Sequence, residues 1–341
     1  MAQQRQGIRE REAPGEDAVL LDVRGLRTSF VLGETTVYAV QGLDVSVAGG
    51  ERLGVVGESG SGKSVAALSV MGMIRPPGRV TDGEVRFQGQ ELRGLPESRM
   101  RRLRGRSMAM IPQNPLTSLN PVLTVGTHFQ EVLRQHLGMS RRAALERGVE
   151  LLRLVGVPDP TSRVGEYAHR LSGGQRQRVM IALAMACEPR LLIADEPTTA
   201  LDVTIQAQIL ELFDGLVADG GLGAILITHN LGIVASHCDR VLVMYAGRVM
   251  ETASVRELFA HPAHPYTVGL LRCVPRLSAE RTRRFHAIPG LPPRVTELVP
   301  GCPFAPRCER ATDRCRQETP PLDPLATGHS AACWHPVGGE A

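Results

Sequence analysis

The segment 57–64 reads GESGSGKS, which has the residue types and spacing of a phosphate-binding loop. Its glycines allow the backbone to turn where a side chain would clash. Inward-pointing N–H groups, together with the positive end of the following helix, should then hold a triphosphate. The residues expected to contact it are Gly57, Ser59, Gly60, Ser61, Gly62, Lys63 and Ser64.

Lys63 is the only lysine among the 39 lysine and arginine residues of the chain. A compact, flexible ammonium differs physically from the planar guanidinium that the chain uses everywhere else. We predict that Lys63 contacts the β and γ phosphates and that the hydroxyl of Ser64 binds Mg²⁺.

Two carboxylates follow a run of apolar residues in LLIADE, 191–196, and a histidine is the next-to-last residue of AILITHN, 224–230. Ligands of parallel sheets lie at the carboxyl ends of the strands. Asp195 is therefore predicted to hold Mg²⁺, and Glu196 to orient and deprotonate a water that attacks the γ phosphate. His229 can contact the same phosphate, although a histidine at a strand end is often structural.

Three further polar or aromatic positions are ambiguous from the sequence. Gln113 ends the expected strand SMAMIPQ, where its carbonyl could reach Mg²⁺ or the attacking water. It could equally be a surface turn residue before Asn114. An aromatic ring near the start of the chain could stack on adenine, and the sequence does not decide between Phe30 and Tyr38.

A second anion-binding helix start is predicted at LSGGQ, 171–175. Ser172 is a natural N-cap, and Gly173 and Gly174 leave backbone N–H groups unobstructed. One chain with one triphosphate loop does not need a second such helix start, so this segment calls for a separate explanation.

The elements that position these residues alternate between strands and helices, which indicates an α/β fold. Strands are predicted at 19–30, twice within 39–59, at 83–91, 191–196 and 224–230, and in a hairpin at 239–254. Helices are predicted at 64–74, within 124–156, behind LSGGQ and after 202.

The composition is that of a globular protein, with 341 residues, 43% hydrophobic residues and a net charge of +4. No apolar stretch is long enough to span a bilayer, and residues 1–17 resemble a disordered lead-in without a signal peptide. We expect a cytosolic protein with reduced or metal-bound cysteines. A basic stripe with interleaved aromatics is absent, which argues against nucleic-acid binding.

Together these segments resemble the nucleotide-binding subunit of ABC transporters. The resemblance assigns GESGSGKS to Walker A, Gln113 to the Q-loop, LSGGQ to the signature, LLIADE to Walker B, TALD to the D-loop and His229 to the switch histidine. It implies a P-loop ATPase domain at 18–260, with an antiparallel β subdomain and a helical subdomain at about 114–185, and a C-terminal extension at 261–341. It adds Asp202 of the D-loop to the nucleotide site.

The same resemblance explains the second helix start. Two such subunits pack head to tail, so the signature of one chain covers the ATP held by Walker A of the other. Ser172, Gly173, Gly174 and Gln175 would therefore act on a partner's nucleotide. The dimer would close on ATP and open after hydrolysis.

Three other segments are similar to the oligopeptide, dipeptide and nickel importer branch: QNPLTSLNP, HPAHPYTVGLL and GCPFAPRC. This implies a peripheral subunit on the cytoplasmic face of the membrane, paired with a sister ATPase, two permeases and an extracellular binding protein. Peptide import is the favoured function, and nickel-chelate or glutathione import are alternatives. A soluble non-transport ATPase of the family is disfavoured by the single cassette and the absence of sustained heptads.

Four cysteines in the tail have the spacing C-x5-C-x6-C-x17-C: Cys302, Cys308, Cys315 and Cys333. Four thiolates can hold Zn²⁺ or an iron–sulfur cluster. The short C-x2-C of a zinc ribbon is missing, and some members of the resembling branch carry a [4Fe–4S] cluster at a similar quartet, so the cluster is favoured. The alternative is four packed, reduced cysteines.

Overall fold

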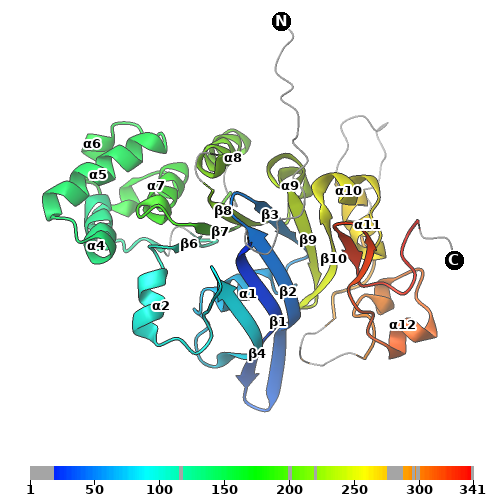
Figure 1. Ribbon diagram of the computed structural model, residues 1–341. Coiled ribbons are helices and arrows are strands. Elements are labelled where there is room, and N and C mark those ends of the chain that lie inside the picture. The colour runs from blue at the N-terminus through cyan, green and yellow to red at the C-terminus, as the bar shows by residue number, and fades with distance from the viewer. Residues whose placement is uncertain are drawn as a thin grey trace, which may run out of the picture.

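The computed structural model describes residues 19–114, 118–198, 202–218, 221–274, 287–293, 296 and 300–338 (Figure 1). The expected lead-in at 1–17 and most of the TALD segment lie outside this part. No helix within it is both long and apolar enough to cross a membrane.

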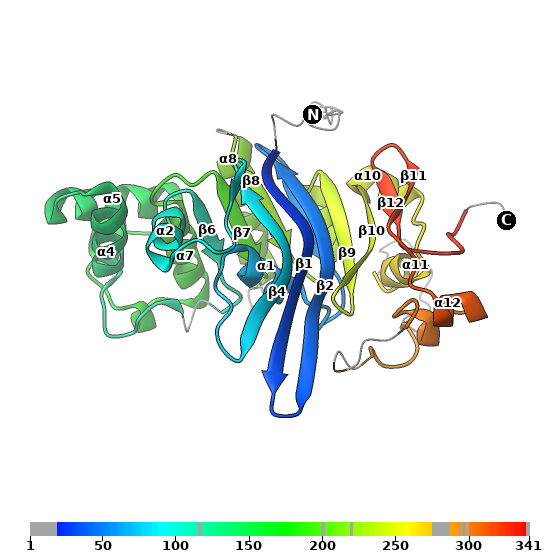
Figure 2. The ribbon, with the colours of Figure 1, turned by 60° about the horizontal axis from the view of Figure 1, so that its bottom comes forward.

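A four-stranded antiparallel sheet with strand order β2-β1-β4-β5 forms one layer. Its long strands are β1 (Val19–Leu32), β2 (Thr35–Ala48) and β4 (Gly78–Phe87), and β5 (Gln90–Glu91) is short. Leu43 and Val47 are buried, as the alternation of apolar residues in β2 predicts. Figure 2 shows these strands side by side in front of α1.

The second sheet has eight strands in the order β11-β12-β10-β9-β3-β8-β7-β6. The parallel members are β3 (Arg52–Val56), β6 (Met108–Ile111), β7 (Leu191–Asp195), β8 (Gly223–Ile227) and β9 (Arg240–Tyr245). Every residue of β7 and β8 is buried, as expected for parallel strands covered on both faces. The carboxyl ends of β3, β6, β7 and β8 therefore meet at one edge.

Helix α1 (Lys63–Val70) packs between the two sheets. Its Ala66, Ala67 and Val70 share a core with Leu21 of β1 and Ile193 of β7. The helix is shorter than the predicted 64–74 because Gly72 takes a positive φ of 60° and the chain turns away. This layering fixes the helix N-terminus, and with it the phosphate loop, against both sheets.

The helical subdomain stands at one end of the molecule (Figure 1). It contains α4 (Val125–Leu137), α5 (Arg141–Leu154), α6 (Pro160–Arg163), η2 (Ala168–Arg170) and α7 (Gly173–Met185). Thr124 caps α4 and Ser140 caps α5 through their side chains. Phe129 and Leu152 lie in a core that extends to β6, β7 and α8 (Val203–Ala218). The arginine-rich α2 (Glu97–Leu103) precedes β6.

The C-terminal region continues the ATPase sheet. After α9 (Leu231–His237), β10 (Arg248–Ser254) pairs with β9 and with β12 (His329–Ala331), and β12 pairs with β11 (Asp323–Ala326). Glu251 of β10, which is fully buried, accepts hydrogen bonds from His329 and from the backbone of Ala263 and His264 at 2.8–2.9 Å. The described residues of 261–338 therefore share a core with the ATPase sheet.

The remaining helices of the C-terminal region are short. They are α10 (Val255–Ala260), α11 (Pro265–Arg272), η3 (Ala305–Arg307) and α12 (Asp313–Gln317). Cys302, Phe304 and Cys315 belong to the same hydrophobic cluster as Tyr245 of β9. Figure 1 shows this region at the end of the molecule opposite the helical subdomain.

Candidate functional site

The phosphate loop connects β3 to α1, and two of its glycines have no space for a side chain. Gly57 has a φ of 152°, and a Cβ there would lie 2.1 Å from the carbonyl oxygen of Met244. Gly62 caps α1 with a φ of 99°, and a Cβ there would lie 2.3 Å from the carbonyl oxygen of Ala39. The loop is therefore pressed between β2 and β9, with a helix N-terminus behind it, as anion binding requires.

Lys63 folds back over the loop. Its Nζ donates to the carbonyl oxygens of Gly57 and Glu58, both at 2.9 Å, and to Oγ of Ser61 at 3.2 Å. Burial lowers the pKa of Lys63, and the nearby carboxylates of Glu196 and Asp195 oppose that shift. The ammonium thus lies inside the ring of loop backbone that would surround a phosphate group.

Ser64 and Asp195 meet at the same edge of the sheet. Oγ of Ser64 donates to Oδ1 of Asp195 at 3.0 Å, and Asp195 is 4% exposed. Burial raises the pKa of Asp195. A hydroxyl and a carboxylate oxygen side by side are the hard ligands that Mg²⁺ prefers.

The carboxylate of Glu196 contacts two of the other predicted residues. Nε2 of Gln113 donates to Oε2 of Glu196 at 3.1 Å, and Nδ1 of His229 lies 3.3 Å from Oε1. Both Gln113 and His229 lie two residues beyond their strands, where the sequence predicted the strand ends themselves. Glu196 has a φ of 48°, a left-handed conformation that is strained for a non-glycine residue. Its backbone N–H donates to Ile227 of the neighbouring strand at 2.9 Å, which holds this conformation.

The signature segment lies at the start of α7. Ser172 and Gln175 form a capping box, in which each side chain bonds the backbone N–H of the other at 3.2 and 3.0 Å. A Cβ at Gly174 would lie 3.0 Å from the side chain of Ile205 of α8, so α7 and α8 approach closely here. Gly173 is the first residue of α7, which belongs to the helical subdomain (Figure 1).

The remaining predicted residues lie on β1, on β2 and at the start of α8. Tyr38 precedes Ala39, whose carbonyl oxygen contacts Gly62 of the loop. Phe30 pairs with Gly78 across β1 and β4 and packs against it. Asp202 is exposed and its carboxylate accepts from the backbone N–H of Ile205 at 2.9 Å, at the first turn of α8.

Comparison with known proteins agrees with this site. Residues 40–199 match the ABC transporter family, and residues 250–315 match the C-terminal region of oligopeptide/dipeptide transporters. The oligopeptide transport ATP-binding protein OppD of Salmonella typhimurium is 48% identical over 326 residues, which cover 96% of each chain. The chain belongs to the ABC transporter ATP-binding family. It is therefore an ABC ATPase, which hydrolyses ATP to drive transport.

Other relatives of this ABC ATPase agree. OppD of Escherichia coli K12 is 48% identical, covering 93% of this chain and 94% of its own. AppD of Bacillus subtilis, another oligopeptide transport ATP-binding protein, is 46% identical, and the match covers 93% of this chain and 97% of AppD. The ATP-binding cassette MJ0796 was solved as a dimer in a post-hydrolysis state with ADP and Pi. It has a TM-score of 0.63 and 25% identity, and the match covers 69% of this chain and 99% of MJ0796. The predicted α/β P-loop fold with its antiparallel and helical parts is confirmed.

The four cysteines of the C-terminal region line one cavity together with His264, Phe304, Trp334 and His335. Within the described ranges, however, no group of three or more His, Cys, Asp or Glu residues is arranged to hold a metal ion. The comparisons name no cluster either. The predicted metal site at the cysteine quartet is thus not supported by the ABC ATPase family match or by this geometry. Cys187 and Cys238 lie outside the quartet, and burial raises the pKa of both thiols, that of Cys238 to about 12.

The sequence did not predict the contacts of Glu58, the second residue of the phosphate loop. Its carboxylate pairs with Arg307, and its backbone N–H donates to the hydroxyl of Tyr266. Arg307 is 249 residues away along the chain. The only feature of the sequence that could have pointed to these contacts is an acidic residue inside an anion-binding loop.

The single lysine of this ABC ATPase permits a direct test of the loop. We expect pyridoxal phosphate followed by borohydride to modify Lys63, because the reagent carries a phosphate and the lowered pKa leaves more of the amine unprotonated than in an ordinary lysine. MgATP should protect the residue, and modification should abolish ATP binding. Peptide mass spectrometry would identify the modified residue, and Lys63→Arg is the control that should remain unlabelled. Loss of ATP binding with Lys63 unmodified would contradict the assignment.

Proposed function

We propose that this chain is the ATP-hydrolysing subunit of an importer for di- or oligopeptides. The observation that carries the proposal is the match of residues 250–315 to the C-terminal region of oligopeptide/dipeptide transporters, in addition to the ABC transporter match. OppD and AppD, whose names state oligopeptide transport, are similar along nearly their whole length. Nickel-chelate or glutathione import by the same machinery is the alternative.

In the proposed reaction, the loop backbone and Lys63 bind the β and γ phosphates of ATP. Ser64 and Asp195 would hold Mg²⁺, which neutralises phosphate charge when bound. Glu196 accepts a proton from the attacking water, and Gln113 and His229 orient that water and the carboxylate. The 3.1 and 3.3 Å contacts of Gln113 and His229 with Glu196 support this assignment. Gln113 is also a proposed Mg²⁺ ligand.

Tyr38 is proposed as the ring that stacks on adenine. It lies next to Ala39, which contacts the phosphate loop, whereas Phe30 packs against Gly78. Asp202 and the signature residues Ser172, Gly173, Gly174 and Gln175 are proposed to act across a dimer interface on the nucleotide of a second ATPase subunit. The capping box supports this role because it holds the first turn of α7 ready to face an anion.

We further propose that the partner ATPase is a related but different chain. Two permeases would hold the pair on the cytoplasmic face of the membrane, and an extracellular binding protein would deliver the peptide. The finding that no helix in the described part could cross a membrane is compatible with a peripheral subunit.

Uptake of a radiolabelled tripeptide tests the function. Cells that express the complete transporter, with this chain as the only source of this subunit, should accumulate the peptide, and cells with Lys63→Ala should not. Nickel and glutathione uptake are measured in parallel. Accumulation of nickel or glutathione without any uptake of the peptide would contradict peptide import and support the alternative.

The cysteine quartet is proposed to hold a [4Fe–4S] cluster rather than a single ion. All four thiols line one cavity, and a cluster places several iron atoms between its ligands, so that they stand further apart than the ligands of one Zn²⁺. Burial, with a smaller contribution from the other cysteines of the quartet, raises the pKa of Cys302 to about 11, so ligation would have to release the proton of this thiol. Iron and sulfide analysis after anaerobic purification tests this, and a folded, colourless protein without iron would contradict it.

A further inference from the structure

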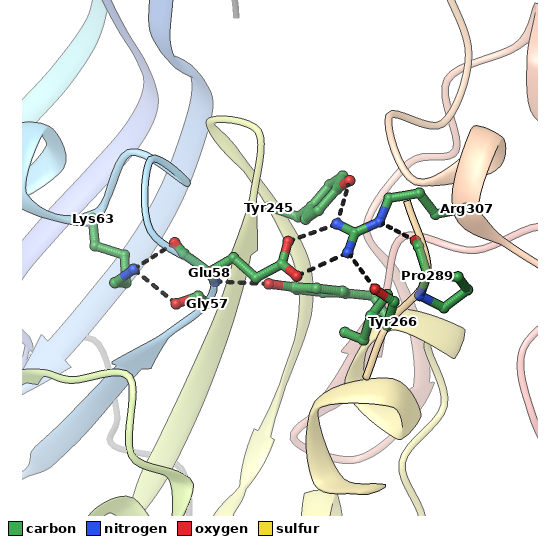
Figure 3. A network of polar contacts seen from close by, with 8 residues as sticks. Gly57, Glu58, Lys63, Tyr245, Tyr266, Pro289 and Arg307 are labelled. Atoms are coloured by element: carbon green, nitrogen blue, oxygen red, sulfur yellow. Dashed lines mark hydrogen bonds and ion pairs between the residues drawn. The ribbon is translucent and has the colours of Figure 1, made fainter. Parts of the chain in front are cut away.

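The phosphate loop is bound directly to the C-terminal region through Glu58 (Figure 3). The backbone N–H of Glu58 donates to the hydroxyl of Tyr266, on α11, at 2.8 Å. The carboxylate of Glu58 accepts two parallel hydrogen bonds from Arg307, on η3, at 2.7 and 3.0 Å. Such a bidentate pair fixes both the distance and the orientation of the two groups.

Every N–H of the Arg307 guanidinium has a partner. Besides the two bonds to Glu58, Nη1 donates to the hydroxyl of Tyr245 at 3.1 Å. Nη2 donates to the carbonyl of Ile288 at 3.2 Å, and Nε to the carbonyl of Pro289 at 2.9 Å. The Arg307 side chain is 4% exposed. A lysine could not replace this fork, because it has three donors and no planar arrangement.

The aromatic rings around Arg307 make this contact rigid. Tyr245 and Tyr266 pack with ring centroids 4.6 Å apart, and Phe304 lies 5.4 and 5.3 Å from them. All three rings are buried. Tyr245 ends β9 of the ATPase sheet, whereas Tyr266 and Phe304 belong to the C-terminal region, so the cluster joins the two.

Glu58 also connects this contact to the lysine of the phosphate loop. Its carbonyl oxygen accepts a hydrogen bond from Nζ of Lys63 at 2.9 Å. The N–H, the carbonyl and the carboxylate of one loop residue are thus all engaged, two of them by the C-terminal region. A shift of Glu58 would therefore move the backbone that surrounds Lys63.

We propose that Arg307 and Tyr266 are positioning residues of the phosphate loop, so that ATP binding depends on the C-terminal region. A carboxylate inside an anion-binding loop opposes the binding of a triphosphate, because like charges repel. Arg307 compensates that charge from outside the loop, and Tyr266 holds the backbone of the same residue. The C-terminal region thereby completes the nucleotide site in addition to its place in the transporter.

Replacement of Arg307 tests the proposal in the full-length chain. We expect Arg307→Gln to raise the Kd for MgATP about tenfold or more, since removal of one partner leaves a partly buried carboxylate unpaired in the loop. Arg307→Lys should recover only part of the affinity. The Kd is measured by competition of MgATP with a fluorescent ATP analogue. Arg316→Gln is the matched control, because Arg316 lies in the same region and pairs with the exposed Asp313.

A second substitution separates charge compensation from a merely structural role. In the double variant Glu58→Gln/Arg307→Gln the carboxylate is gone, so the Kd should return to within about threefold of the wild-type value, because the mutations act on one contact. Glu58→Gln alone should raise the Kd less than Arg307→Gln does, because it leaves no unpaired carboxylate in the loop and keeps the backbone contact with Tyr266. A double variant as weak as Arg307→Gln would overturn the proposal.

Tyr266→Phe tests the backbone contact, and it keeps the proposal testable if Arg307→Gln does not fold. It removes one hydroxyl from a packed ring and leaves the Glu58 N–H without its acceptor, so the Kd for MgATP should rise several-fold, about threefold to tenfold. An unchanged Kd for both Tyr266→Phe and Arg307→Gln would overturn the proposal, and so would weaker binding in the Arg316→Gln control.

Discussion

Glu196→Gln is expected to reduce steady-state ATP hydrolysis by about 10²- to 10⁴-fold, the range that a general base contributes. The amide keeps the size of the carboxylate and cannot accept a proton from water. Phosphate release measures the effect. The Kd for MgATP should remain within about threefold of the wild-type value, because Lys63 and the loop backbone, the groups proposed to contact the phosphates, are unchanged in this variant.

The expected trapped state gives this prediction a second readout. If ATP closes the dimer and hydrolysis opens it, the Glu196→Gln subunit should accumulate as an ATP-bound dimer with its partner ATPase in size-exclusion chromatography. Glu146→Gln is the matched control, because Glu146 lies on the exposed face of α5 and pairs with Arg142. Full hydrolysis by Glu196→Gln would refute the role of Glu196 as the base.

The sequence indicates which candidate residues lie together where one short segment carries both the residue types and their position. In GESGSGKS and LLIADE, the candidate residues follow buried strands directly, so the edge of the sheet brings Oγ of Ser64 within 3.0 Å of Oδ1 of Asp195. Gln113 and Glu196 are 83 residues apart, but both follow adjacent parallel strands, and the same rule brings them together.

The sequence could not predict contacts that depend on the packing of an irregular segment. Residues 261–341 contain few periodic patterns, so neither the pairing of β12 with β10 nor the position of Arg307 follows from local propensity. The left-handed conformation of Glu196 is a second example, because an acidic residue carries no signal for a positive φ. Both features arise from tertiary contacts.

Gly62→Ala is expected to raise the Kd for MgATP by more than about 100-fold, which corresponds to ~2.7 kcal/mol. The new Cβ would lie 2.3 Å from the carbonyl oxygen of Ala39 and 3.3 Å from Cα of Gly247. These are backbone atoms of the two segments that enclose the loop, so the loop must move away from them. Because Gly62 caps α1, that movement would turn the first N–H groups of the helix away from the phosphates.

A control at Gly138 separates this clash from the general cost of a positive φ. Gly138 ends α4 with a φ of 66°, and a Cβ there would have no neighbouring atom within 4 Å, so Gly138→Ala should cost only the ~1–2 kcal/mol of left-handed strain. It should lower the melting temperature and leave the Kd for MgATP unchanged. Gly62→Ala should instead lose the rise in melting temperature that MgATP gives to the wild type. If both variants kept the rise in melting temperature with MgATP, the close approach of β2 to Gly62 would not be required for nucleotide binding. The fit of the loop between the two sheets would then no longer explain its affinity for phosphate.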